Sequence, residues 1–125
     1  MLEEFLGVFS MEYGYVRNST NNEKSIEKQK EELLKYAKEQ NVVVDDTGEQ
    51  FRAMLAKMQN GDSIHVMHTD RITKNPEVLL SIIKEMMNKD VSLIENGEKV
   101  DLVKLEEQLS KIVALYISEF DEEEE

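Results

Sequence analysis

The sequence predicts an α/β domain in which helices flank a mostly parallel sheet of four to five strands. Short β-branched or aromatic runs alternate along the chain with longer segments whose apolar residues recur at helical spacing. Such alternation is typical of parallel sheets covered by helices. A long apolar pattern near the end of the chain adds a long C-terminal helix to this domain, and the chain of 125 residues suits a single core.

Four segments are predicted as strands. Tyr13–Val16 is a short apolar run, and Val42–Val44 is entirely β-branched. Ser63–His68 and Val91–Ile94 follow further along the chain. The pair Asn96-Gly97 after the fourth segment predicts a tight turn, because both residue types tolerate positive φ.

Two helices are predicted before the third strand. The first covers residues 25–40, and the residues expected on its apolar face are Ile26, Leu33, Leu34 and Ala37. The second carries an i, i+3, i+4, i+7 series formed by Phe51, Met54, Leu55 and Met58. Asn60 and Gly61 are expected to end it, since glycine adopts a left-handed backbone without strain.

Asn75-Pro76 predicts the start of the next helix, with asparagine as the cap and proline in the first turn. Its apolar face is wide and consists of Leu79, Leu80, Ile82, Ile83, Met86 and Met87. This width predicts a helix that is deeply buried against the sheet.

The final helix begins near Asp101 and carries two apolar stripes. One stripe steps by three and four, as a coiled-coil seam does, through Leu102, Leu105, Leu109, Ile112 and Tyr116. The other consists of Val113, Ile117 and Phe120. One stripe can cover the domain, so the other predicts a homodimer or higher oligomer through this helix. The alternative is that both stripes are buried within one chain.

The length suits one domain, predicted over residues 11–121, with an N-terminal extension over 1–10 and an acidic tail over 122–125. Translation could start at Met1 or Met11. No apolar run approaches the roughly 20 residues of a membrane span, and no basic residue precedes the apolar start as in a secretory signal. The absence of cysteine excludes disulfides and thiolate metal sites. A cytoplasmic location, without cofactor or membrane partner, is the simplest expectation.

The chain is strongly acidic, with a formal net charge of −12 and only three arginines among its 15 basic residues. DNA binding draws much of its free energy from cations that neutralise phosphates. DNA is therefore disfavoured as a partner unless the few cations gather in one cleft. Solubility is the simpler explanation of the excess charge.

Polar residues follow two of the predicted strands. Arg17 and Ser19 follow the first strand, whereas Asp70 and Arg71 follow the third. Ligand sites in parallel sheets lie beyond the carboxyl ends of strands, so these four side chains converge if the two strands are neighbours. An arginine two residues from a serine could hold a phosphate beside a nucleophile.

In order and spacing, these residues resemble the catalytic domain of the serine site-specific recombinases, the family of resolvases and DNA invertases. The resemblance covers roughly residues 13–120. The matching positions are Tyr15, Arg17, Ser19, Thr20, Gln29, Gly61, Asp62, Asp70 and Arg71.

The resemblance implies a role for each polar residue. Ser19 would attack a DNA phosphodiester and form a 5′-phosphoserine linkage, while Arg17 and Arg71 would bind the scissile phosphate. Asp70 would orient an arginine or manage a proton, and Gln29 would help to hold the pocket. Outside the resemblance, Ser19 could simply cap a turn and Asp70 could pair with Arg71.

The sequence departs from the family pattern at several positions. A flexible loop with an essential arginine is missing, and Gly48 stands about where that arginine aligns. Arg52 is near in sequence, but it is predicted inside a helix and is a doubtful substitute. Lys74 replaces a further arginine, which keeps the charge but loses the bidentate fork.

The last helix also departs from the pattern, since Asp121 and Glu122 stand where the family has Glu-Arg. We expect no DNA-binding module after this helix. These departures predict a catalytically degenerate domain that acts as a regulatory or protein-interaction module of a phage or mobile element. The alternative is an active recombinase domain that cleaves and rejoins DNA while a partner supplies DNA binding.

Two other groups of residues are candidate sites. His65 and His68 are three apart on a predicted strand, which places them on opposite faces and predicts that one is a core histidine. Asp45-Asp46 ends the second strand and could bind Mg²⁺ with water, as in the acidic pocket of a response-regulator receiver domain. No paired acidic motif follows the first strand, which argues against that reading.

Overall fold

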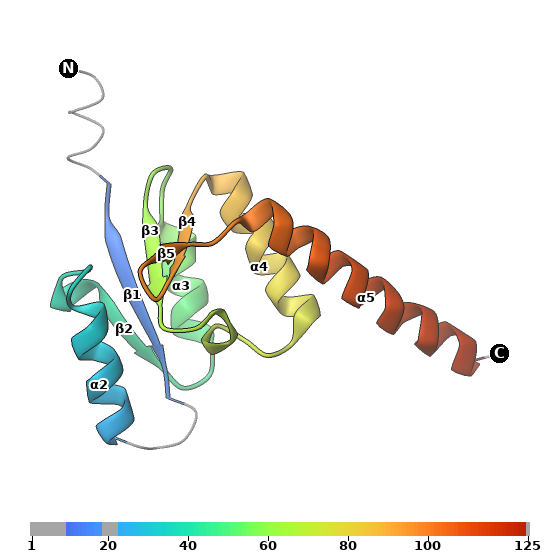
Figure 1. The fold of residues 1–125 in the computed structure, drawn as a ribbon, viewed down its shortest axis with the longest axis horizontal. Helices are drawn as coiled ribbons and strands as arrows, with labels where there is room; N and C mark the ends of the chain where they lie inside the picture. The colour runs from blue at the N-terminus through green and yellow to red at the C-terminus, as the bar shows by residue number, and fades with distance from the viewer. Residues whose placement is uncertain (1–9, 19–22, 125) are drawn as a thin grey trace.

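The elements alternate between strand and helix, as predicted, in a computed structural model that describes residues 10–18 and 23–124 (Figure 1). They are β1 (Glu12–Arg17), α2 (Glu23–Leu33), η1 (Glu39–Asn41), β2 (Val42–Asp45), α3 (Glu49–Lys57), β3 (Ser63–Val66), η2 (Thr69–Arg71), α4 (Pro76–Lys89), β4 (Ser92–Glu95), β5 (Glu98–Lys99) and α5 (Leu102–Glu124). The predicted α/β class with a long C-terminal helix is confirmed.

Within the described residues the strands form one five-stranded sheet in the order β2-β1-β3-β4-β5. β1 pairs in parallel with β2 and with β3, and β3 pairs in parallel with β4. β5 adds an antiparallel edge after the turn at Asn96 and Gly97, whose φ values are 47° and 84°. Because β1 lies beside β3, the segments that follow these two strands leave the sheet at the same edge.

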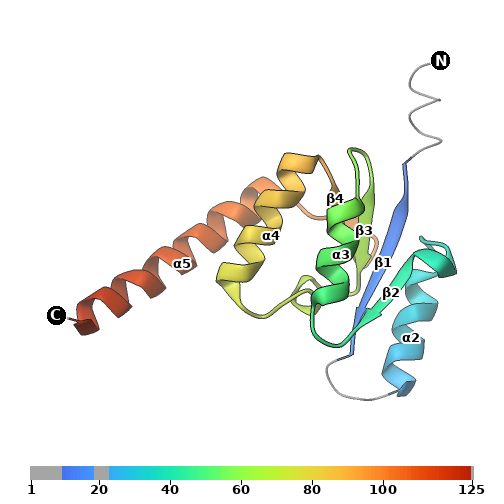
Figure 2. The ribbon, with the colours of Figure 1, turned by 180° about the vertical axis from the view of Figure 1, so that it is seen from behind.

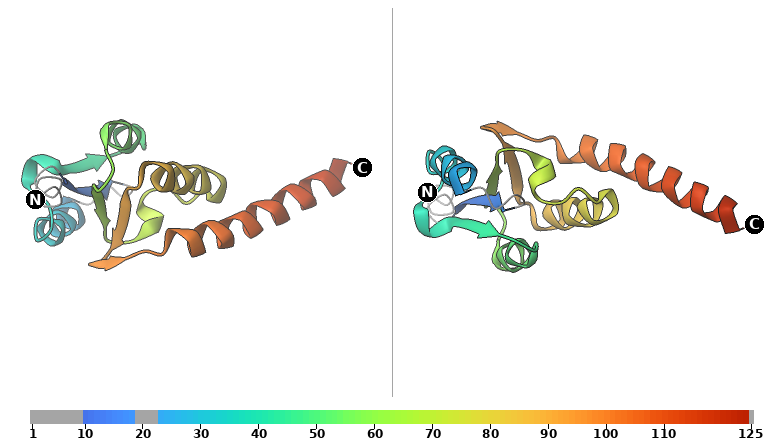
Figure 3. Two further views of the ribbon diagram at one scale, coloured as in Figure 1. Left: turned by 90° about the horizontal axis from the view of Figure 1, so that it is seen from above. Right: turned by 90° about the horizontal axis from the view of Figure 1, so that it is seen from below.

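Helices cover both faces of the sheet, with α2 on one side and α3 on the other (Figures 2 and 3). On the α2 side, a Cβ at Gly14 would lie 3.2 Å from the Cβ of Leu33, so the close approach of α2 requires glycine there. On the other side, Tyr15 packs edge-on against Phe51 of α3, with ring centroids 4.9 Å apart. β1 is therefore a central strand buried on both faces.

The core lies between the sheet, α3 and α4. Each of these elements contributes fully buried side chains, and full burial of one such side chain contributes about 1.5–3 kcal/mol. The predicted apolar faces of the two helices are confirmed, since the buried residues include Phe51, Met54, Leu55, Ile82, Ile83 and Met86 together with Ile64, Val66 and Leu93 of the strands.

The prediction of a helix over residues 25–40 is wrong at its end. α2 ends at Leu33, whose carbonyl accepts hydrogen bonds from the backbone N–H groups of Tyr36 and Ala37, both at 3.0 Å. This turn reverses the chain so that β2 can begin at Val42. Ala37 is buried in the turn, whereas Leu34 is 43% exposed and does not share an apolar face with it.

Two further boundaries differ from the prediction. α3 ends at Lys57, and Gly61, with φ of 95°, shapes the turn before β3 instead of capping the helix. β3 ends at Val66, two positions before His68, because the chain enters the short helix η2 at Thr69. In both cases the helix or strand ends before the position that the local sequence predicts, and the chain turns there.

α5 projects away from the body of the domain beyond α4 (Figures 1 and 3). Leu109 of its predicted seam is buried at 6% exposure, but Ile112 is 50% exposed and Tyr116 is 66% exposed. The described part of the chain therefore does not bury both stripes. Ile117 and Phe120 lie where side chains are not described. None of the described helices has the length and apolar character needed to cross a membrane.

The start of α4 provides a test of the capping prediction. The Asn75 side chain accepts hydrogen bonds from the N–H groups of Glu77 at 2.9 Å and Val78 at 3.2 Å. Asn75→Ala removes both bonds, so the free energy of unfolding should fall by about 1 kcal/mol. Urea denaturation followed by circular dichroism measures this loss. Asn88→Ala, at an exposed position of the same helix, should not lower stability, because alanine has the higher helix propensity.

Candidate active site

Three of the predicted site residues lie along the carboxyl edge of β1 and β3. Arg17 is the last residue of β1, and Asp70 and Arg71 lie in η2, which follows β3. Ser19 and Thr20 fall outside the described residues, so the predicted nucleophile remains a prediction from sequence.

Arg17 is half-buried on the side of the sheet that carries α3. Its Nη1 atom lies 3.5 Å from the hydroxyl of Tyr15 and 3.5 Å from the carbonyl oxygen of Ile72, which are long contacts for hydrogen bonds. The side chain lines a cavity of about 330 Å³ together with Gly48 and Arg52 of the α3 region.

Arg71 and Gln29 lie together in a second cavity of about 270 Å³, next to α2. Gln29 Nε2 donates to Ser25 Oγ at 3.2 Å, and Lys28 and His68 also line this space. Arg71 Nε is buried and has no hydrogen-bond partner among the described residues. A cationic group with an unsatisfied donor beside a lysine suits an anion chemically.

The structure does not bring the predicted site residues into one cavity. Arg17 points to the same face of β1 as Tyr15, toward α3, whereas Arg71 lines the cavity beside α2. Asp70 is exposed, and no ion pair joins it to Arg71 within the described chain. The roles that the resemblance implies for Arg17, Gln29, Asp70 and Arg71 therefore remain predictions.

Asp45 is a site residue whose role the sequence did not reveal. It is only 2% exposed, and its carboxylate accepts hydrogen bonds from the Tyr15 hydroxyl at 2.9 Å, from Phe51 N–H at 3.0 Å and from Thr47 N–H at 3.2 Å. Burial raises the pKa of Asp45, but these hydrogen bonds outweigh burial and hold the pKa below its usual value.

This arrangement gives Asp45 a structural role at the N-terminus of α3. Its charge interacts favourably with the helix dipole and satisfies donors of the first turn. The described residues contain no group of three or more metal-ligating side chains. The sequence signal was an aspartate placed a few residues before a predicted helix, which is a frequent cap position.

Tyr15 connects Asp45 to Arg17. Burial raises the pKa of the Tyr15 hydroxyl to about 12; the Arg17 contact lowers it and the Asp45 hydrogen bond raises it. The hydroxyl is therefore neutral near pH 7 and donates to Asp45 while it faces the Arg17 guanidinium. Tyr15, which belongs to the recombinase sequence pattern, thus helps to position the Arg17 side chain.

Gly61 and Asp62 of the family pattern lie at the opposite edge of the sheet, before β3. The Asp62 carboxylate accepts from Met11 N–H at 2.9 Å and from Gln59 N–H at 2.9 Å. Asp62 therefore links the start of β1 to the α3–β3 turn by hydrogen bonds. This part of the sheet is distant from the carboxyl edge.

The prediction that the two histidines lie on opposite faces of one strand is wrong, because β3 ends at Val66 and His68 lies beyond it, in the cavity next to α2. His65 is buried, its Nε2 lies 2.6 Å from Glu12 Oε2, and its ring stacks on Tyr36 with centroids 4.8 Å apart. His68 is exposed. The expectation of one core histidine is confirmed.

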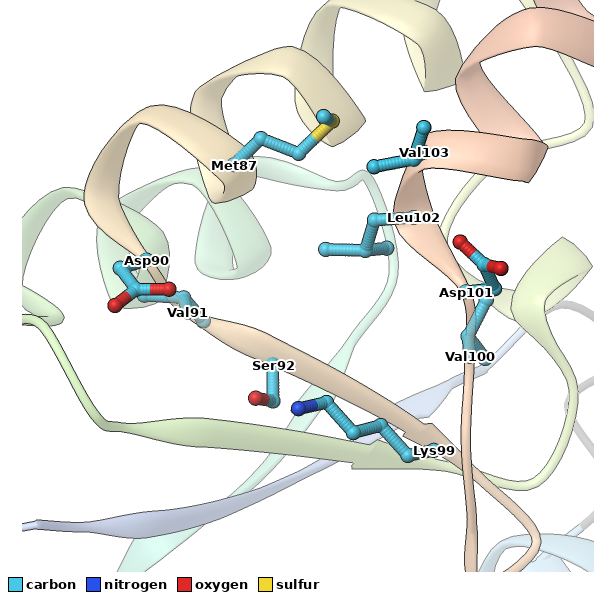
Figure 4. Close-up of a pocket in the computed structure, with 9 residues that line it drawn as sticks. All are labelled: Met87, Asp90, Val91, Ser92, Lys99, Val100, Asp101, Leu102 and Val103. Carbon is cyan, nitrogen blue, oxygen red and sulfur yellow. The ribbon is translucent and has the colours of Figure 1, made fainter.

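A wider cavity of about 530 Å³ lies between the end of α4 and the start of α5 (Figure 4). Apolar side chains such as Met87 and Leu102 line it, with Lys99 and Asp101 at its margin. None of the predicted site residues lines this cavity, so it is separate from the carboxyl edge of β1 and β3.

Comparison with known protein families identifies the family of this chain. The sequence matches the family described as "Resolvase, N terminal domain" over residues 12–125. The chain belongs to this family. The resemblance to serine recombinases is thereby confirmed, and the observed sheet and C-terminal helix fit a resolvase domain. No curated protein matches the chain.

The structure also locates the departures of this resolvase domain from the family pattern. Only Asp46, Thr47 and Gly48 connect β2 to α3, so the long flexible loop is replaced by a tight connection. Gly48 adopts φ of 96°, and Lys74 is exposed before α4. Arg52 lies inside α3, as predicted, and yet it lines the same cavity as Arg17.

Asp45→Asn tests the buried carboxylate. At pH 7 we expect the free energy of unfolding to fall by about 1.5–3 kcal/mol, since hydrogen bonds to a charged group are lost. The folded pKa is depressed, so this stabilisation is present above the usual aspartate pKa of about 3.9 and is lost as pH falls through the folded pKa.

Urea unfolding at a series of pH values from 7 to 3 measures the effect. The difference between wild type and Asp45→Asn should shrink at the acid end. Asp46→Asn is the matched control, because Asp46 is exposed. Equal losses for the two variants, or a difference that grows toward low pH, would contradict the assignment.

Proposed function

We propose that this serine recombinase-like domain is catalytically degenerate and acts as a regulatory or protein-interaction module of a phage or mobile element. One observation carries the proposal: Arg17 and Arg71, the arginines expected to bind one scissile phosphate, line different cavities. Phosphoryl transfer depends on positioned charge around a single phosphate. The mobile-element setting comes from the family, in which such domains are common.

The departures from the family pattern strengthen the proposal. Gly48 supplies no charge where the pattern has an arginine, and Lys74 is exposed. Removal of one preorganised donor costs roughly 100- to 1000-fold in rate. The losses need not multiply, since residues that act as a unit are non-additive, but even one leaves slow chemistry.

The exposed side of α5 is the proposed interaction surface. Its exposed apolar residues are Val103, Ile112, Leu115 and Tyr116, at 50–66% exposure. A projecting helix with such a stripe supports a homodimer or higher oligomer, or a second protein bound in the same way. The same helix carries the acidic end of a chain with net charge −12, which disfavours DNA as its partner.

The second candidate function is an active recombinase domain to which a partner delivers DNA. It is favoured by the placement of Arg17 and Arg71 at the carboxyl ends of neighbouring strands, where a shift of η2 relative to β1 would bring Arg71 toward Arg17. In this function Ser19 forms a 5′-phosphoserine linkage with DNA.

A gel assay for a covalent protein–DNA adduct separates the two functions. Supercoiled DNA incubated with wild type should give no adduct and no nicked product, and Ser19→Ala should behave identically. An adduct that forms with wild type and disappears with Ser19→Ala would establish the active domain and remove the proposal of degeneracy.

Leu115→Ser tests the α5 surface. Leu115 is 66% exposed, so the substitution should leave the fold intact and shift the oligomer toward the monomer by weakening apolar contact. Light scattering over a concentration series measures the mass. Leu34→Ser is the matched control, because Leu34 is 43% exposed on another part of the surface and should not change the mass. A wild-type monomer at every concentration would refute self-association.

A further inference from the structure

This acidic chain has three arginines, and each of them lines one or the other of two cavities at the same edge of the sheet. Arg17 and Arg52 share the cavity beside α3, and Arg71 lines the other. The ion pairs of the described chain are Lys35 with Glu32 and His65 with Glu12, so no arginine is paired with a carboxylate there. Arg17 and Arg52 carry like charges and line the same cavity, and an anion bound there would reduce the repulsion between them.

Backbone geometry explains how Arg52 reaches the Arg17 cavity. Arg52 N–H donates to the carbonyl of Gly48 at 3.2 Å, so Arg52 lies one turn into α3 from that residue. Side chains of a helix lean toward its N-terminus, and the Arg52 side chain therefore extends back over the turn that contains Gly48.

Gly48 brings this turn close to Arg17. A Cβ at Gly48 would lie 3.1 Å from Arg17 Nη1, so no side chain separates Arg17 from the first turn of α3. The short connection from β2 places the helix start directly at the strand end. The position that lacks the loop arginine is thus the one over which Arg52 extends.

We propose that Arg52 acts with Arg17 as a second guanidinium in one binding site for a phosphate group. Guanidinium binds phosphate oxygens in a bidentate manner and keeps its charge at all physiological pH values. Thr47 and Thr73 also line this cavity. Glu49 lines the cavity as well, but it forms no ion pair with either arginine in the described chain.

The site takes the phosphate either as a free anion or as a diester in a nucleic-acid strand. A cavity of about 330 Å³ accommodates one phosphate with part of its ester group. The inference rests on the proposed recombinase-like use of this edge, but it requires neither Ser19 nor strand cleavage. Phosphate binding by Arg17 and Arg52 is therefore compatible with a degenerate catalytic site.

Nuclear magnetic resonance titration of the whole chain tests this site. The three arginines give few side-chain Nε–Hε signals, and the probes are inorganic phosphate and thymidylyl-thymidine, a small diester, at constant ionic strength. Saturable shifts are expected for Arg17, Arg52 and the Gly48 amide. The probe that binds more tightly identifies the free anion or the diester as the preferred source.

Arg52→Gln should weaken binding by about tenfold or more, since it removes hydrogen bonds from a charged donor. Lys57→Gln is the matched control: it changes the net charge equally, in the last turn of the same helix, away from the cavity. Equal weakening by the two variants, shifts confined to Arg71, or the absence of saturable shifts would each overturn the proposal. Formation of a Ser19–DNA adduct would overturn catalytic degeneracy and leave this result unaffected.

Discussion

The buried carboxylate of Asp45 is the interaction on which the arrangement of the carboxyl edge depends. It ends β2, receives the hydroxyl of Tyr15 from β1 and accepts N–H groups at the start of α3. A buried charge is tolerated only where hydrogen bonds replace its hydration, and here the helix N-terminus supplies them. Two strands and a helix are thereby joined at one side chain, directly beneath Arg17.

This junction has a consequence for the cavity above it. With Asp45 as the internal anion of α3, the helix begins close to the end of β2, and Gly48 lies against the Arg17 guanidinium. A long loop could carry a side chain to and from a ligand, whereas a short connection holds the first turn of α3 in place. The domain thus has a preorganised pocket of modest size instead of a mobile arm, and Arg52 belongs to the rigid element.

Much of the fold could be predicted from sequence because local patterns determine it. The β-branched run at Val42–Val44, the cap at Asn75 and the turn at Asn96 and Gly97 each depend on neighbouring residues alone, and each appears in the structure. The end of α2 could not be predicted, since Leu34 continues the helical pattern while the chain turns to reach β2. The role of Asp45 and the side of β1 on which Arg17 lies depend on contacts between segments distant in sequence. The same holds for the division of the predicted site into two cavities.

The acidic net charge of the chain and the arginines of the cavities act on a bound anion over different distances. Charges separated by more than about 8 Å are largely screened at physiological ionic strength, so carboxylates farther than this from the cavity do little to a phosphate bound between Arg17 and Arg52. They act instead on an extended polyanion that must lie along the surface and approach α5, where their repulsion accumulates along the backbone. A net charge of −12 therefore opposes binding along a DNA duplex but does not oppose binding of a single phosphate. The placement of Arg17 and Arg52 in one cavity, with Arg71 in another, supports the proposal that this resolvase domain binds phosphate without cleaving a strand.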